Sequence, residues 1–243
     1  MTLGLSRRIA AIATLSMGLL MGSMAGVAAQ SPAPVGSAPA ATSLDGSWTI
    51  DHSIGSYDYA ANDFSGSWAG YRAQEELVGI GGTEAIGRTP DIEGSITLAG
   101  TQLTAADLTV DLTTLASDQS MRDGQLGRQG VQTDQFPTAT FVLTEPIELG
   151  VIPAEGTAIN VTAVGDLTLH GVTRNVSIPM AAVQQGDIIG VSGSITFTWA
   201  EFGMEQPSSM RVVSLADDVS MEFQAFFRHD AGAAASPVAS PAS

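Results

Sequence analysis

The side chains best suited to catalysis or metal binding in this chain are its three histidines, His52, His170 and His229. Imidazole ligates metals and moves protons near neutral pH, so these residues and a nearby carboxylate could build a metal site or an acid–base pair. No hydrolase elbow, phosphate-binding loop or zinc-protease motif accompanies them. The simpler interpretation places His52 at a strand end, His170 in a turn and His229 at the domain's end. We therefore expect no catalytic residue, no metal and no cofactor.

Two pairs of adjacent charged residues could take part in acid–base catalysis or in an ion pair. The adjacent carboxylates Glu75 and Glu76 could serve acid–base catalysis, but adjacent residues of a strand point to opposite faces. We expect this pair on a solvated surface. Arg122 and Asp123 differ, because they lie in the one segment without strand periodicity. They could form an ion pair that pins this segment, or contact the polar end of a ligand.

Composition excludes several classes of protein. The chain has 243 residues, 25 of them acidic against 9 arginines and no lysine, with a net charge of −16. The absence of cysteine rules out disulfides, thiolate metal sites and a cysteine nucleophile. A pI near 4.2 argues against binding to nucleic acid or to anionic lipid headgroups. At 44% hydrophobic and 14% charged residues, the chain is apolar enough to bury a core.

The N-terminus predicts export. Arg7 and Arg8 precede an apolar run over 9–20, and small residues follow up to Ala29. These are the parts of a cleavable signal peptide, which we place at 1–29. We expect general secretory export rather than the twin-arginine route, and a secreted or periplasmic, cell-envelope location with no stable membrane insertion after cleavage. An uncleaved anchor is the alternative, since this stretch is almost long enough to span a bilayer.

Low-complexity tracts mark the borders of a single domain. The tract at 30–43 is rich in Pro, Ala and Ser, and we interpret it as a linker. A similar Ala/Ser/Pro tail follows at 231–243. Between them, 44–230 shows no shift in composition and no repeat, so we expect one domain there. Removal of 1–29 takes two arginines with it, which leaves 7 − 25 = −18 on the mature chain.

Alternating side chains predict that this domain is all-β. Apolar and polar residues alternate over 108–112, 159–169, 195–199 and 219–227. A period of two with threonine on one face is typical of half-exposed antiparallel strands. About eight such strands joined by hairpins would form a barrel or a sandwich, and we favour the barrel. One segment, near 118–130, has helical spacing and predicts a short helix.

Several motifs together make the sequence more specific than a generic β domain. They are Trp-Thr-Ile-Asp-His-Ser at 48–53, Met-Arg-Asp at 121–123, Phe-Pro-Thr-Ala-Thr-Phe at 136–141 and Gly-Asp-Leu-Thr-Leu-His-Gly-Val-Thr-Arg at 165–174. In this order the chain resembles the YceI-like family of lipid-binding proteins over about 48–227. The resemblance implies an extended, eight-stranded antiparallel, lipocalin-like barrel. It also implies a pore for a long apolar partner such as a polyisoprenoid, an isoprenoid quinone or a fatty-acyl derivative.

The apolar strand faces would then line the pore. The residues expected to do so are Val110, Leu112, Phe136, Phe141, Leu167, Leu169, Phe197, Trp199 and Phe223. A second set could contact a polar headgroup or pin a loop: Arg122, Asp123, Arg128, His170 and Arg174. A dry lining of this kind binds by burial, which contributes ~25 cal/mol per Å².

Two other functions fit the same sequence. In the first, the barrel is a ligand-free structural module of the envelope, and large side chains fill it. The candidates for filling it are Phe141, Phe197, Trp199, Phe223 and Phe227. In the second, His52, His170 and an acidic residue form the site of an envelope enzyme. An apolar outer strip could also pair two barrels as a homodimer.

Overall fold

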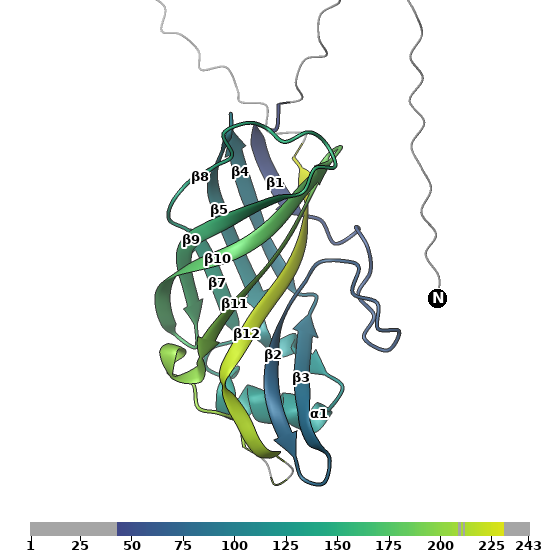
Figure 1. Ribbon diagram of the computed structural model, residues 1–243, viewed down its shortest axis with the longest axis vertical. Coiled ribbons are helices and arrows are strands. Elements are labelled where there is room, and N and C mark those ends of the chain that lie inside the picture. The colour runs from purple at the N-terminus through teal and green to yellow at the C-terminus, as the bar shows by residue number, and fades with distance from the viewer. Residues whose placement is uncertain (1–42, 209, 211, 231–243) are drawn as a thin grey trace, which may run out of the picture. The chain divides into compact units, whose positions relative to one another are not determined.

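Antiparallel strands dominate the computed structural model of the chain, which describes residues 43–208, 210 and 212–230 (Figure 1). The predicted signal peptide, the predicted tail and all but the last residue of the predicted linker lie outside this described part. Within it, no helix is both long and apolar enough to cross a membrane.

Eight strands form a closed ring in the order β1-β4-β5-β7-β9-β10-β11-β12, because β12 also pairs with β1. These strands are β1 (Gly46–Ile50), β4 (Ile92–Ala99), β5 (Gln102–Asp111), β7 (Thr138–Leu143), β9 (Ile159–Leu169), β10 (Val172–Gln185), β11 (Ile188–Thr198) and β12 (Val212–His229). Closure is antiparallel, with Trp48 opposite His229 and Ile50 opposite Phe227. The predicted eight-stranded antiparallel barrel is therefore confirmed, and the sandwich is wrong.

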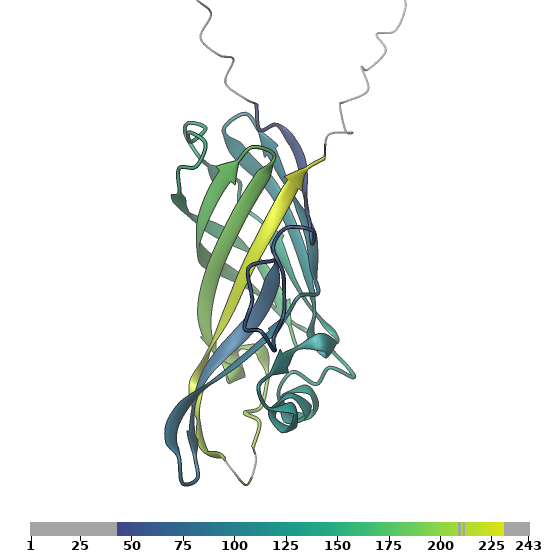
Figure 2. The ribbon, with the colours of Figure 1, turned by 90° about the vertical axis from the view of Figure 1, so that its right-hand side faces the viewer.

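Four further strands extend this ring: β2 (Trp68–Leu77), β3 (Gly81–Thr89), β6 (Ala116–Ser117) and β8 (Ile147–Glu148). The edge of β12 that meets β1 is much longer than β1 itself. Below β1, the β2 strand takes over this edge and pairs from Trp68 opposite Gln224 to Leu77 opposite Val212. The β2–β3 hairpin thus completes the wall at one end of the barrel (Figures 1 and 2).

Short helical elements lie at this same end (Figures 1 and 2). They are η1 (Leu112–Thr114), α1 (Ser120–Gln125), the π-helical turn η2 (Leu126–Gly130) and η3 (Trp199–Phe202). The helix predicted near 118–130 is confirmed as α1 followed by η2. Leu126 and Val131 are buried at 6% and 7% exposure, so this segment covers the barrel end with apolar side chains.

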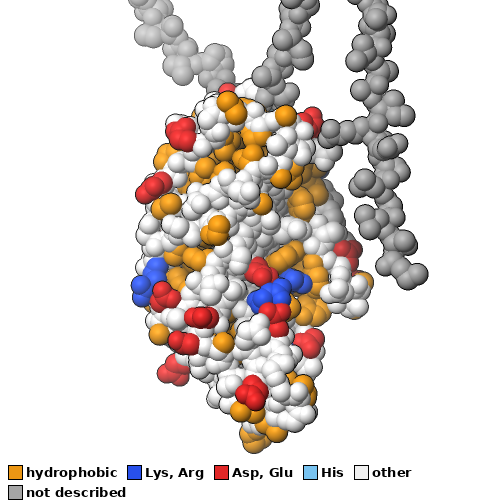
Figure 3. Space-filling model, in the orientation of Figure 1, with side chains coloured by type: hydrophobic (Ala, Val, Ile, Leu, Met, Phe, Trp, Pro, Cys, Tyr) orange, Lys and Arg blue, Asp and Glu red, His pale blue; other side chains and the backbone are white. Residues whose placement is uncertain are grey.

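Alternation along each strand separates an apolar interior from a polar exterior. Phe227 and Trp48 are 1% and 2% exposed, whereas most charged side chains lie outside, as on the face in Figure 3. On the outer face of β2, Arg72 contacts both Glu84 and Glu222. The acidic surface therefore keeps its charge in water while the interior stays apolar.

Candidate apolar binding site

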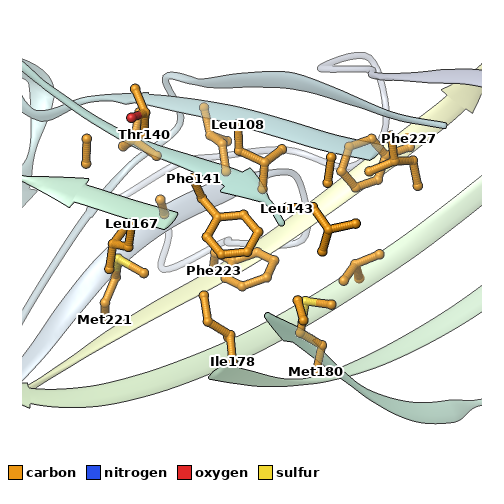
Figure 4. A pocket seen from close by; sticks show the side chains of 18 of the residues that line it. Leu108, Thr140, Phe141, Leu143, Leu167, Ile178, Met180, Met221, Phe223 and Phe227 are labelled. Carbon is orange, nitrogen blue, oxygen red and sulfur yellow. The ribbon is translucent and has the colours of Figure 1, made fainter. Parts of the chain in front are cut away.

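A row of apolar cavities runs along the inside of the barrel. The central cavity, of about 80 Å³, is surrounded by side chains that include Leu108, Phe141, Ile178 and Phe223 (Figure 4). Toward α1 lies the helix-side cavity of about 70 Å³, against Leu126 and η3. Toward the opposite end lies the distal cavity, also about 70 Å³. Together these three cavities follow the long axis of the barrel.

Neighbouring cavities share walls made of side chains. The central and helix-side cavities are both lined by Ala69, Val110, Ala139 and Met221. The central and distal cavities are both lined by Ile96, Leu103, Ile147, Met180 and Val191. Methionine has three rotatable side-chain bonds, so these partitions can rearrange without movement of the backbone.

The lining of these three cavities carries no charge. It consists of aliphatic, aromatic and methionine side chains with a few neutral polar groups such as Thr140 and Tyr71. Burial of hydrocarbon is therefore the interaction that this interior offers, at ~25 cal/mol per Å² removed from water.

Eight of the nine side chains expected to line the pore border the central or the helix-side cavity. They are Val110, Leu112, Phe141, Leu167, Leu169, Phe197, Trp199 and Phe223. Phe136 does not border them, because it lies before Pro137 and outside the alternating part of β7. Its ring instead packs on His170, with the ring centroids 4.5 Å apart.

Glycines on neighbouring strands make room for the largest rings of the lining. A Cβ atom at Gly165 would come within 2.4 Å of Phe141 Cζ, and one at Gly193 within 2.7 Å of Phe223 Cε1. Each ring therefore lies against the bare backbone of the adjacent strand. Figure 4 shows both rings in the middle of the central cavity. An isolated glycine in an alternating strand is the sequence signal for such a close approach.

Arg122 and Asp123 do not pair with each other. The Arg122 guanidinium lies 2.6 Å from Glu75 and 2.5 Å from Asp118, which is four residues earlier and precedes α1. Asp123 instead accepts hydrogen bonds from the Ser117 amide at 2.9 Å and hydroxyl at 2.5 Å. Adjacent helical residues point in different directions, whereas residues four apart share a face.

Glu75, the partner of Arg122, does not lie on a solvated surface, so the expectation for the pair Glu75 and Glu76 is wrong for Glu75. Glu76 is exposed, but Glu75 is buried at 6% exposure, on the inner face of β2. This ion pair joins α1 to β2 and borders a small cavity of about 40 Å³, here called the anchor cavity, which Tyr71 also lines. Burial lowers the pKa of Arg122, but its hydrogen bonds to Asp118 and Glu75 outweigh that effect and leave the pKa raised.

The remaining headgroup candidates lie apart from the three apolar cavities. Arg128 borders a polar surface pocket of about 300 Å³ together with Asp123 and Asp134. His170 lies in the β9–β10 turn at φ 52°, with Nδ1 3.2 Å from the Phe202 carbonyl oxygen. Arg174 donates to the backbone carbonyl of Glu201. His170 and Arg174 are therefore held by contacts with η3, and none of the three residues lines an apolar cavity.

The other two histidines have separate neighbours. His52 Nε2 lies 3.2 Å from Glu93, and His229 Nε2 lies 3.0 Å from the Asp45 carbonyl oxygen. Across the described residues, no three His, Cys, Asp or Glu side chains come together as a metal site would require.

Comparison with known proteins places this barrel among relatives. A family model described as the YceI-like domain matches residues 48–227. A UPF0312 protein of Pseudomonas aeruginosa is 32% identical over 139 residues, which cover 52% of this chain and 68% of that protein. A UPF0312 protein of a Shewanella species is 30% identical over 145 residues, covering 55% and 72%.

A solved structure shares the fold. It is a polyisoprenoid binding domain from Saccharophagus degradans implicated in plant cell wall breakdown, and it aligns with a TM-score of 0.55 and 16% identity. The alignment covers 75% of this chain and 98% of that domain.

Proposed function

Because this chain belongs to the YceI-like family, we propose that its barrel binds and carries one long apolar molecule, of the polyisoprenoid, isoprenoid quinone or fatty-acyl type. The observation that carries this proposal is the row of uncharged cavities with shared walls along the barrel axis. The polyisoprenoid-binding domain with the same fold supports the ligand class. In this proposal the protein is a carrier without catalytic residues or cofactor.

Loading requires the lining to move. The central cavity measures about 80 Å³, well below the ~300–1,000 Å³ of typical small-molecule sites. Met180 and Met221 stand at the partitions, so a chain that displaces their side chains joins neighbouring cavities. The rings of Phe141 and Phe223 lie in the middle of the central cavity, each against a glycine, so a ligand chain must pass beside them or displace them as well.

A bulky residue inside the barrel should block binding, whereas the same residue outside should not. Ala106 lines the central cavity, and its neighbour Ala105 is exposed on the outer face of β5. We expect Ala106→Phe to weaken binding of a long-chain prenol at least about ten-fold, or ~1.4 kcal/mol. Ala105→Phe is the matched control and should bind as the wild type does. Native mass spectrometry and titration calorimetry measure both.

Equal binding by the two variants would contradict a site in the central cavity. Failure of the wild-type protein to bind any long-chain prenol, fatty acid or quinone, with none extracted from the purified protein, would contradict the carrier function itself.

We also propose that 1–29 is removed on export, which gives a secreted or periplasmic protein. Mass spectrometry of the exported protein should find Gln30 as its first residue, and retention of the apolar stretch would indicate an anchor instead. A homodimer paired through an apolar outer strip could also form, and Val78 and Ile80 at the β2–β3 tip are apolar and 63% and 75% exposed. Sedimentation of the same sample reports whether that dimer forms.

A further inference from the structure

One hydroxyl group at the wall of the apolar cavities lacks a hydrogen-bond partner. Among the described residues, three buried side-chain atoms are unpartnered: Tyr71 Oη, Arg88 Nε and His170 Nε2. Arg88 lies between the rings of Phe64 and Trp68, at 4.3 and 4.4 Å, which compensates its charge. His170 lies in a turn against Phe136. Tyr71 is the one of the three that borders the apolar cavities.

The position of the Tyr71 ring is fixed by the neighbouring strand. Tyr71 lies opposite Gly87 in the β2–β3 register. A Cβ atom at Gly87 would come within 2.3 Å of Tyr71 Cε1 and 3.0 Å of Tyr71 Oη. Glycine at this position therefore makes room for both the ring and the hydroxyl. The side chain borders both the helix-side cavity and the anchor cavity.

A buried hydroxyl without a partner is unusual in folded proteins, because its desolvation is not compensated. Burial raises the pKa of Tyr71 above its ordinary value, so the hydroxyl keeps its proton and can donate a hydrogen bond. A ligand that brings an acceptor oxygen into the helix-side cavity would satisfy it.

The charges nearby determine which acceptor fits. The charged residues that line the anchor cavity are Glu75 and Arg122, and they are paired with each other at 2.6 Å. Asp118 further neutralises the guanidinium. The helix-side cavity has no charged lining residue. A diphosphate would therefore meet no uncompensated cation here, and it would approach the carboxylate of Glu75.

We propose that Tyr71 is the specificity-determining residue of the pore, and that it donates a hydrogen bond to a neutral oxygen at the polar end of the ligand. This inference rests on the proposed carrier function and adds the orientation of the ligand in the barrel. The neutral hydroxyl or carbonyl end lies beside α1, and the hydrocarbon chain extends through the central cavity toward the distal cavity. The barrel then selects neutral amphiphiles over their phosphorylated counterparts.

The test uses three probes with the same prenyl chain: the prenol, the oxygen-free hydrocarbon and the prenyl diphosphate. Wild-type protein should bind the prenol tightest. Tyr71→Phe should weaken prenol binding roughly five-fold and leave hydrocarbon binding unchanged within about two-fold. Because the variant removes an unpartnered hydroxyl, its Tm without ligand should equal or exceed that of the wild type.

Tyr57→Phe is the matched control, since the Tyr57 hydroxyl donates to the Arg88 carbonyl oxygen at 2.9 Å and Tyr57 does not line the three apolar cavities. It should lower Tm and leave binding of all three probes unchanged. Equal prenol binding by wild type and Tyr71→Phe, or tightest binding of the diphosphate, would overturn the role of Tyr71 while the carrier function stands. Absence of binding for all three probes to the wild type would instead overturn the carrier function.

Discussion

Replacing Arg122 with methionine should lower the free energy of unfolding by about 3–5 kcal/mol. The Glu75 side chain is 4% exposed and its carboxylate lies 2.6 Å from Arg122 Nη2. Loss of the guanidinium would leave a buried carboxylate without its counterion, and desolvation of an unpaired charge is costly. Urea unfolding followed by circular dichroism measures the change.

The second ion pair of Arg122, with Asp118, provides a control for this prediction. Asp118 also contacts Arg122, but its side chain is 65% exposed. Asp118→Ala should therefore change stability by no more than about 0.5 kcal/mol. The double variant Glu75→Met/Arg122→Met should recover most of the loss, because both charges leave together. A change below about 1 kcal/mol for Arg122→Met alone would show that the pair behaves as an ordinary surface salt bridge.

Phe223→Ala should lower the free energy of unfolding of the ligand-free protein by about 3 kcal/mol. The ring is 9% exposed and packs on Gly193 in the central cavity, so its removal deletes buried surface and leaves a larger void. A long-chain prenol at about 100 times its Kd should then restore ~2.7 kcal/mol. Thermal unfolding with and without the prenol measures both quantities.

This variant also separates a carrier from a filled barrel. If Phe223 lines a binding pore, the enlarged cavity still accepts the apolar chain, and the ligand stabilises the variant at least as much as the wild type. If the ring is part of a plug, prenol does not stabilise the wild type, although the void in the variant can still accept it. Absence of stabilisation by prenol in the wild type would favour the ligand-free structural module.

Much of the fold follows from local pattern. The alternation over 159–169 predicts a strand with one apolar face, and β9 has these bounds. The break in alternation near 118–130 predicts the helical segment, because a helix and a strand place apolar residues at different periods. The motifs also predict the family. These properties depend on residues close together in the chain, so the sequence alone determines them.

Side-chain environment depends on closure of the barrel. The rule that adjacent strand residues face opposite sides is correct for Glu75 and Glu76, yet it does not say which faces inward. Pairing of β2 with β12 directs Glu75 inward, against Arg122 on α1. The family motif predicted Phe136 in the pore lining. Because Phe136 precedes β7, its ring packs on His170 instead.

Tyr71 shows the same division between sequence and structure. Ala69, Tyr71 and Ala73 follow each other at a period of two. The sequence could therefore predict that Tyr71 shares a strand face with small apolar residues. That its hydroxyl is buried without a partner depends on Gly87 across the hairpin and on the two cavities it borders. The sequence determined the all-β pattern, the acidic charge and the supply of apolar faces. The tertiary structure decided which face points inward, because a strand's register is set by its partners rather than by its own residues.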